Sequence, residues 1–526
     1  MTHWTAPPTR RELTLLLICV TIFVCAYNAE TTLRLVGLSD SSLVPFSSTR
    51  APPIGPDGRR PEAYRDALEN EIFGEWDWDA GRIAGVKAAE EERVKGGSEH
   101  RDRYVHGEGK TGVNAMWLQG LSEGKYISGD GLGSTTVNDD FIHWGDEVPR
   151  TKLVSHVPGF TIVDNLTMSF GTFFLVTDDP SSLPKADAIA SSSLERGAPP
   201  NDFDWQILPA GEATAKLGNF GGRMHGVTFL SYDGSNDGYT LLSLQRLYST
   251  LNDTSPPHRL LIPAVPTFSD PKPDPDDGEV PRQRSSLGVH PYTLKAAYPS
   301  LSGPLFTEDF DDFTGLNAPI ILDRAVIVDR GASFRAGQNG AAAWTRPFVE
   351  LDAPETWFEP IRRNLAAYFG LPKGGDKGAV EVTYLSRQVE GPPLRREDHD
   401  ALVKGLKRLS VKVHIVDETT PWTDRMQALV RSSIVIGAYG DHLSSSVFMN
   451  PSPSATLMEF FPSGAFVSNW AVVMRSMGIN YVAWQGTQKF TSDALPAVTR
   501  PSGPQNIHID AAAVVRAVSE ELTRHV

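Results

Sequence analysis

Cysteine is nearly absent from this 526-residue chain. The two cysteines, Cys19 and Cys25, lie in one apolar segment near the N-terminus. The chain beyond Cys25 therefore contains no intrachain disulfide and no cysteine ligand for zinc. A chain of this length can be stable without disulfides, so the lack of cysteine does not decide between an oxidising and a reducing compartment.

A common signature for ATP is also missing, because the sequence contains no P-loop. Positive charge is in the minority, with 49 Lys and Arg against 64 Asp and Glu and a formal net charge of −15. This balance argues against nucleic acid as a partner, although it allows a local basic pocket for phosphate.

Long apolar runs are rare, and one of them stands out. Residues 13–29 carry no charge and follow Arg10 and Arg11. This pattern predicts a short transmembrane signal anchor, with residues 1–12 as a cytoplasmic tail and the body of the chain in the lumen. The expected location is the membrane of the Golgi or endoplasmic reticulum. A cleaved signal peptide remains an alternative, whereas a buried core helix is disfavoured by the flanking arginines.

Two Asn-x-Thr triplets become meaningful if the body is lumenal. They begin at Asn165 and Asn252, and each is an acceptor for N-glycosylation. Such triplets also arise by chance, so they support the lumenal assignment only mildly.

Composition divides the rest of the chain into three parts. Residues 30–105 are rich in Pro, Ser, Gly and charge and are predicted to form a stem. Residues 106–345 show short apolar runs between turns and are expected to form an N-terminal acceptor lobe. Residues 346–526 alternate regularly between strand and helix patterns, which predicts a parallel sheet with helices on both faces.

Ligands of such sheets bind beyond the carboxyl ends of the strands. Three features fall at predicted strand ends: Arg387, the loop from Gly437 to His442, and Glu459. An arginine pairs well with a diphosphate, a glycine-rich turn before a helix favours an anion, and a carboxylate can bind ribose hydroxyls. Together they predict a nucleotide-sugar site.

The segments TYLSRQ, RREDHDAL, SIVIGAYGDHLSSSVFMNPSPSATLMEFFP and MGINYVAW, in this order, resemble the C-terminal region of glycosyltransferase family 61. This family includes xylosyl-, arabinosyl- and N-acetylglucosaminyltransferases. The resemblance implies an α/β fold of the GT-B type, with two Rossmann-like lobes around a nucleotide-sugar cleft. It also implies an inverting enzyme, a UDP-sugar donor, and a glycan or glycoprotein acceptor in the secretory pathway.

The resemblance assigns residues by position. Donor-binding positions are Ser386, Arg387, Arg396, Gln427, Gly437, Tyr439, Gly440 and Glu459. Arg387, Arg396 and the loop would hold the diphosphate, and Glu459 would lie near the ribose. The chain departs from the family pattern where Tyr439 replaces a histidine and where Asp441-His442 replaces Ala-Gly.

An inverting transferase needs a base for the acceptor hydroxyl and positive charge for the leaving diphosphate. The candidate bases are His442, Asp441, Asp237 and His225. We predict no essential protein-bound metal, since the acidic runs 137–141 and 308–313 are expected in polar loops. A requirement for Mn²⁺ or Mg²⁺ stays open.

Two other functional classes remain. A catalytically degenerate relative that binds sugars or acts as a scaffold is suggested by the Tyr439 replacement. A glycoside hydrolase would need two opposed carboxylates, and no feature of the sequence singles out such a pair.

Overall fold

The computed structural model describes residues 142–144 and 147–523, apart from 194, 196, 233–237, 252–254, 267–271, 275–277, 281–286, 302–303, 316–317, 338–344, 372–379, 389–391, 453–454 and 502–505. The predicted tail, membrane anchor and stem lie outside the described residues. So do Asp237, Asn252 and the acidic run at 137–141. Within the described part, no helix combines the length and apolar character that crossing a membrane requires.

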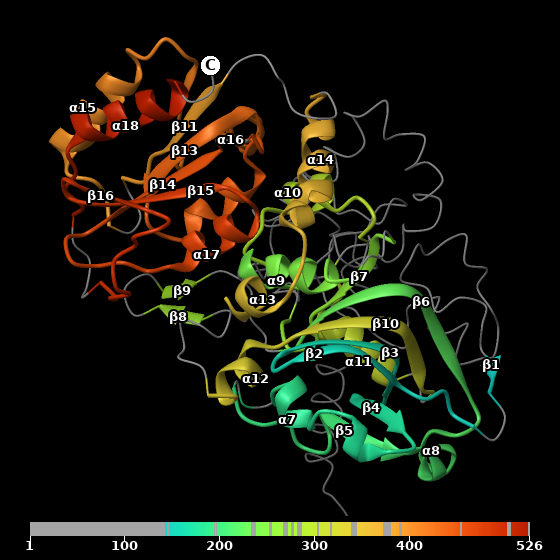
Figure 1. The fold of residues 1–526 in the computed structure, drawn as a ribbon. Helices are drawn as coiled ribbons and strands as arrows, with labels where there is room; N and C mark the ends of the chain where they lie inside the picture. The colour runs from blue at the N-terminus through green and yellow to red at the C-terminus, as the bar shows by residue number, and fades with distance from the viewer. Residues whose placement is uncertain are drawn as a thin grey trace, which may run out of the picture. The chain divides into compact units, whose positions relative to one another are not determined.

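The described chain is an α/β protein with two mixed sheets (Figure 1). The first sheet has eight strands in the order β1-β6-β10-β3-β4-β5, with β2 also on β3 and β7 also on β6. Its strands are β1 (Ile142–His143), β2 (Lys152–Val157), β3 (Phe160–Ser169), β4 (Thr172–Thr177), β5 (Trp205–Pro209), β6 (Phe220–Ser231), β7 (Pro257–Leu261) and β10 (Ile320–Val328).

The first sheet is not the parallel sheet expected of a Rossmann-like lobe. Strand β3 runs antiparallel to β2, β4 and β10, while β10 and β7 are parallel to β6. The antiparallel pairing of β3 with β4 has a local cause, because Phe170 and Gly171 between them both have positive φ, of 49° and 79°. A two-residue turn of this kind joins neighbouring strands as a hairpin and makes them antiparallel.

The second sheet confirms the predicted alternation of strands and helices. Its order is β12-β11-β13-β14-β15-β16, and every pairing is parallel except that of β15 with β16. Its strands are β11 (Glu381–Leu385), β12 (Val413–Val416), β13 (Ser432–Ala438), β14 (Thr456–Phe461), β15 (Asn480–Gln485) and β16 (Gln488–Thr491). The chain passes from β11 to β12 on one side, then returns to β13 on the other side, which makes a topological switch point between β11 and β13.

The remaining elements connect or cover these sheets. The helices are α7 (Ala186–Ile189), α8 (Ala210–Leu217), α9 (Gly238–Tyr248), α10 (Pro291–Ala297), α11 (Thr307–Gly315), α12 (Arg330–Arg335), α13 (Arg346–Glu350), α14 (Glu359–Tyr368), α15 (Arg396–Leu406), α16 (Trp422–Arg431), α17 (Asn469–Ser476) and α18 (Ala511–Thr523). Short 3₁₀ helices are η4 (Pro180–Ser182), η5 (Glu355–Phe358) and η6 (Asp441–Phe448), and β8 (Lys272–Asp274) pairs with β9 (Gly278–Val280).

The second sheet is buried on both faces, as parallel sheets usually are. Along β13, Ile434 and Ile436 pack with α15 and α18, whereas Val435 packs with α16 and α17 on the opposite face. Figure 1 shows α15 and α18 side by side. This alternation explains why all seven residues of β13 are buried and why its central residues, Ile434 to Ile436, are consecutive apolar residues.

One hydrophobic cluster includes residues from both lobes. It joins Phe229 of β6 and Leu244 of α9 to Met426 of α16 and Trp470 of α17. Helix α9 therefore packs in the same hydrophobic cluster as the helices of the second sheet. This packing places the first residues of α9 beside the switch point.

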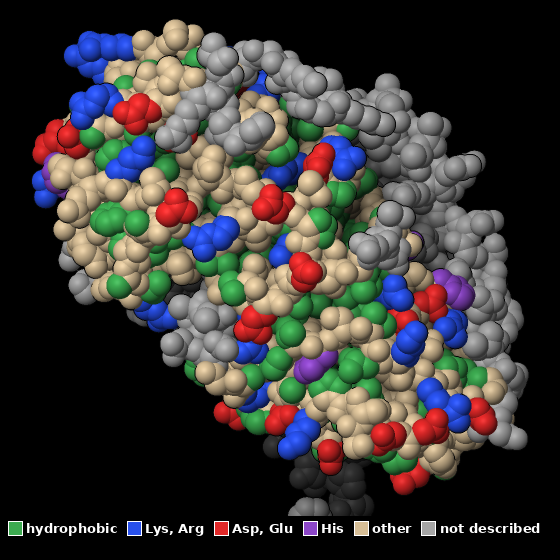
Figure 2. Space-filling model, in the orientation of Figure 1, with side chains coloured by type: hydrophobic (Ala, Val, Ile, Leu, Met, Phe, Trp, Pro, Cys, Tyr) green, Lys and Arg blue, Asp and Glu red, His purple; other side chains and the backbone are tan. Residues whose placement is uncertain are grey.

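The surface visible in Figure 2 carries acidic and basic side chains that are interspersed over both lobes. On this face, the described side chains do not gather into a broad patch of one sign. The face therefore adds nothing in favour of a nucleic-acid partner.

Candidate functional site

Strands β11, β13 and β14 bring the predicted site residues to one sheet edge. Ser386 and Arg387 directly follow β11, Tyr439 and Gly440 directly follow β13, and Glu459 lies in β14 opposite Gly437. Because β11 and β13 flank the switch point, the connections that follow their carboxyl ends lead to opposite sides, and a crevice is expected between them.

A cavity with a volume of about 720 Å³ lies at this crevice. Ser386, Arg387, Tyr439, Gly440, Asp441, His442 and Glu459 line it, as the sequence predicts. Its size falls in the range of about 300–1,000 Å³ that is typical of small-molecule sites.

Gly440 is the tightest point of this site. Its φ of 141° is a conformation that side chains strongly disfavour, and a Cβ atom there would lie 2.4 Å from Nη1 of Arg387. The indole Nε1 of Trp470 donates a hydrogen bond to the Gly440 carbonyl, at 3.2 Å. Only glycine at this position allows the backbone to pass so close to the guanidinium.

Glu459 is a carboxyl group buried in the cavity wall, with 1% of its surface exposed. The hydroxyl of Tyr481 donates to its Oε2 at 2.5 Å. Burial raises the pKa of Glu459 to about 8, although hydrogen bonds from Tyr481 and from the Gly440 backbone act in the opposite direction. At neutral pH the site therefore holds a protonated carboxyl, which can both accept and donate a hydrogen bond.

His442 is held in its neutral form. Burial lowers its pKa to about 3, and the positive charges of Arg387 and Arg425 lower it further. Nη1 of Arg387 lies 3.4 Å from Nδ1 of His442, and because arginine only donates, Nδ1 accepts and Nε2 carries the proton. That Nε2 atom is buried and meets no hydrogen-bond partner within the described part of the chain. His442 is therefore a poor proton acceptor.

Helix α9 supplies the side of the cavity that belongs to the first lobe. The hydroxyl of Tyr239 donates to Oδ1 of Asp441 at 3.2 Å, and its ring lies 4.9 Å from the ring of Trp470. Asp441 itself is exposed at the cavity edge. A carboxylate in this position can receive a proton from a ligand in the cavity.

Three predicted donor-binding residues are not among the described residues that line the cavity: Arg396, Gln427 and Gly437. Arg396 is exposed at the first position of α15. Gly437 has a packing role instead, since a Cβ atom there would lie 2.7 Å from Cδ2 of Leu443.

Sequence reasoning missed four residues that complete the site: Tyr239, Arg425, Trp470 and Tyr481. Arg425 lines the cavity and donates through Nη2 to the Asp417 carbonyl at 3.0 Å. A basic residue early in α16, a helix that leads into β13, was an available signal. The other three are aromatic residues from separate elements, and no sequence pattern connects them.

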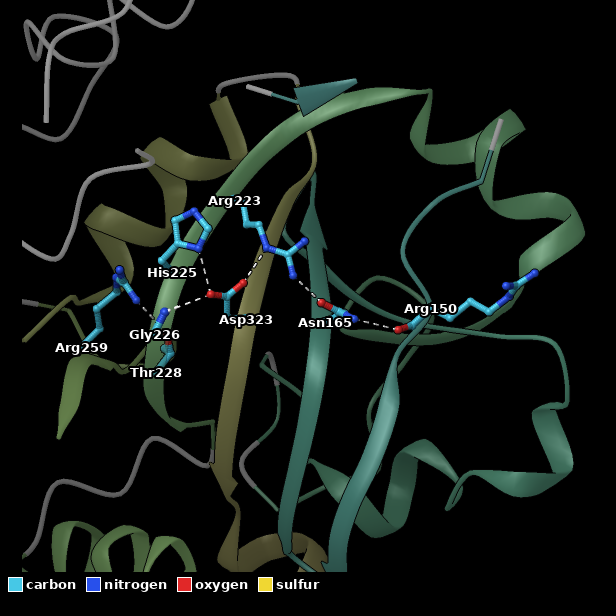
Figure 3. A network of polar contacts seen from close by, with 8 residues as sticks. All are labelled: Arg150, Asn165, Arg223, His225, Gly226, Thr228, Arg259 and Asp323. Carbon is cyan, nitrogen blue, oxygen red and sulfur yellow. Dashed lines mark hydrogen bonds and ion pairs between the residues drawn. The ribbon is translucent and has the colours of Figure 1, made fainter. Parts of the chain in front are cut away.

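A second polar network lies on the first sheet, around a β-bulge (Figure 3). Asp323 of β10 accepts hydrogen bonds from Arg223 and His225, at 2.5 and 2.9 Å. Burial acts to raise the pKa of Asp323, but these hydrogen bonds outweigh it and hold the pKa below its usual value. His225, one of the candidate bases, thus lines a separate cavity of about 600 Å³ and not the cavity at the switch point.

Asn165, a predicted glycosylation site, belongs to the same network. Its Oδ1 accepts from Arg223 at 2.7 Å, and its Nδ2 donates to the Arg150 carbonyl at 3.1 Å (Figure 3). It has a positive φ of 56°, and its side chain is half-buried. The amide thus takes part in the fold, in addition to being a candidate acceptor.

The acidic run at 308–313 was expected in a polar loop, and this was wrong, because it lies within α11. Asp309 is buried there and accepts from the Phe306 amide at 2.9 Å, as a helix-capping side chain does. In the described ranges, His, Cys, Asp and Glu side chains form no group of three or more that could hold a metal ion.

Comparison with known proteins adds no relative from which a role could be transferred. The chain matches no protein-family model, and it matches no curated protein.

Proposed function

We propose that this chain is a glycosyltransferase that moves a sugar from a UDP-sugar donor to a glycan or glycoprotein acceptor. The observation that supports this most is the cavity at the switch point, where two arginines and a buried glutamate line the same wall. The resemblance to glycosyltransferase family 61 points to the same site. On this proposal the two lobes form a GT-B arrangement, and xylose or N-acetylglucosamine is the donor sugar.

The residues of the cavity offer binding groups for the diphosphate and for the ribose of the donor. Arg387 and Arg425 would neutralise the diphosphate, both in the bound donor and as it leaves. Gly440 allows the phosphates to approach the backbone closely. The Glu459 carboxyl, hydrogen-bonded to Tyr481, would bind the ribose hydroxyls.

Asp441 is the base that we favour for the acceptor hydroxyl. It is exposed at the cavity edge, and Tyr239 orients it by a hydrogen bond. His442 is less suited, because its pKa is lowered to about 3 and its Nε2 is buried. An inverting reaction then needs one direct displacement, in which the acceptor oxygen attacks the anomeric carbon as the diphosphate leaves.

The compartment is part of the same proposal. A signal anchor at residues 13–29 would place the enzyme in the membrane of the Golgi or endoplasmic reticulum, with the body in the lumen. Metal dependence is left to measurement, by comparing turnover with Mn²⁺, with Mg²⁺ and with a chelator.

The proposal is tested by calorimetric titration of UDP into the full chain. Arg387→Gln removes a charged donor, which typically costs about 1.5–3 kcal/mol, so UDP affinity should fall roughly 10- to 150-fold. Arg363→Gln is the matched control, since Arg363 is an exposed arginine on α14. No UDP binding by the unmodified chain, or equal affinities in the two variants, would contradict the proposal.

Turnover separates the base from the binding residues. Asp441→Asn should retain UDP affinity within a few-fold and lose most UDP-sugar hydrolysis or transfer. If hydrolysis by Asp441→Asn equals that of the unmodified chain, Asp441 is not the base.

A catalytically degenerate sugar-binding protein is the second candidate function. Two observations favour it: the ring of Tyr439 stacks on Phe461 at 5.5 Å, where the family carries a histidine, and His442 is held neutral. UDP binding without hydrolysis of any UDP-sugar, unchanged by Tyr439→His, would support this candidate over the enzyme.

A further inference from the structure

A smaller cavity, of about 260 Å³, lies beside the cavity at the switch point. The two cavities share Arg425 in their walls, and the first residues of α9, Gly238 and Tyr239, line one each. The smaller cavity lies between α9, α10 and η6.

Two buried polar atoms of residues that line this cavity have no hydrogen-bond partner among the described residues. Tyr298 is 3% exposed, and its hydroxyl meets no hydrogen-bond partner in the described part of the chain. The same is true of the buried Nε of Arg425. Buried polar groups in folded proteins are nearly always hydrogen-bonded, and each exception calls for an explanation. Two exceptions around one cavity suggest that a polar ligand satisfies them.

The chemical character of the other residues that line the cavity indicates which kind of ligand fits it. Leu241, Met426 and Phe448 give it apolar surface, and Ser444 and Ser445 of η6 add side chains that carry hydroxyls. No carboxylate is among the described residues that line it. Apolar walls with a few fixed polar groups suit a neutral ring that carries hydroxyls at its edge and C–H groups on its faces, as a sugar does.

The volume of the smaller cavity and its position beside the larger one indicate which sugar of the reaction it binds. The cavity lies just below the usual range for drug-sized ligands, so it has room for one ring. The larger cavity, of about 720 Å³, has room for the donor, and its residues are proposed to hold the donor's diphosphate and ribose. We infer that the smaller cavity binds the terminal sugar ring of the acceptor, next to the donor site. This inference rests on the proposed transferase function and specifies its acceptor class.

Tyr298→Phe tests the inference, because it removes the hydroxyl alone. Removing a buried hydroxyl that has no partner should not lower the stability of the unliganded chain. It should weaken sugar binding by about five- to tenfold, the usual effect of one hydrogen bond. The probes are methyl β-glycosides of xylose, glucose, galactose, mannose and N-acetylglucosamine, titrated into the full chain with and without UDP by ligand-observed NMR.

Tyr248→Phe is the matched control. The Tyr248 hydroxyl donates to the Ser255 carbonyl at 2.7 Å, so its removal should destabilise the chain and leave glycoside binding unchanged. The inference is overturned if no glycoside binds, or if Tyr298→Phe leaves its affinity unchanged. It is also overturned if Tyr298→Phe weakens binding of UDP-sugar but not of UDP or of any glycoside, since the cavity would then hold the donor sugar.

UDP affinity, measured in the same samples, shows whether the acceptor site alone is wrong or the proposed function as well. If UDP binds and no glycoside does, the acceptor site is wrong and the proposed function stands. If UDP does not bind, the proposed function fails.

Discussion

Replacing Glu459 by Gln should remove a pH-dependent loss of stability. The glutamate carboxyl is 1% exposed and accepts a hydrogen bond from Tyr481. Glutamine has nearly the same shape as a protonated glutamic acid, and its amide oxygen can accept the same hydrogen bond. The variant therefore imitates the protonated form of the site at every pH.

The magnitude follows from the pKa of Glu459, which burial raises from an ordinary 4.5 to about 8. Since the folded chain holds this proton more tightly than the unfolded chain does, the contribution of Glu459 to stability is full below pH 4.5. It is lost as the pH rises towards 8. Each pH unit between the two pKa values is worth about 1.4 kcal/mol, so the total loss is on the order of 5 kcal/mol at most.

Urea denaturation of the full chain between pH 5 and pH 8 measures this difference. The free energy of unfolding of the unmodified chain should fall relative to that of Glu459→Gln by several kcal/mol across the range. Glu147→Gln serves as the control, because that side chain is 76% exposed and should give a curve parallel to the unmodified one. Parallel curves for Glu459→Gln would show that Glu459 is ionised in the folded chain and would refute the reasoning.

Three other outcomes follow from particular contacts. Gly440→Ala places a methyl group against Arg387 and adds about 1–3 kcal/mol of backbone strain, so the UDP affinity measured by calorimetry should fall at least tenfold. An unchanged affinity would mean that the loop at Gly440 and Arg387 do not bind UDP together. Arg246→Met leaves three backbone carbonyls without their hydrogen-bond donor, so the free energy of unfolding measured by urea denaturation should fall by about 3 kcal/mol. A fall below about 1 kcal/mol would mean that these carbonyls find other donors. Thr167→Val should abolish a glycan at Asn165 without lowering the free energy of unfolding, since the buried Thr167 hydroxyl has no partner in the described ranges. Asn165→Gln should abolish the glycan and also destabilise the chain, because its side chain accepts a hydrogen bond from Arg223. The glycan is detected as a mobility shift upon deglycosylation, and an unmodified chain without that shift would contradict the assignment.

The five parallel strands of the second sheet could be predicted because each is a largely apolar run that alternates with a helix along the chain, whereas the polar, antiparallel β16 was not predicted. Arg387 and Glu459 could be placed together for the same reason, since the ends of parallel strands meet at one edge. The first sheet resisted prediction, because its mixed pairing depends on the hairpin turn at Phe170 and Gly171. A regular alternation of strand and helix is a local pattern, whereas mixed pairing is set by turns and long-range contacts.

The contacts that complete the candidate site could not be predicted from the sequence. Tyr239 reaches Asp441 across about 200 residues of chain, and this contact depends on how α9 packs against η6. Tyr298 lines the smaller cavity through a comparable long-range approach. The depressed pKa of His442 likewise results from burial and two arginines in space, and not from its neighbours in sequence. Side chains of this kind are identified only once the packing is known.

A structure of the chain with bound UDP tests the central claim most directly. The account predicts the diphosphate between Arg387, Arg425 and the backbone at Gly440, with the ribose hydroxyls on the Glu459 carboxyl. Density for UDP elsewhere, for example in the cavity beside Asp323 on the first sheet, would contradict it.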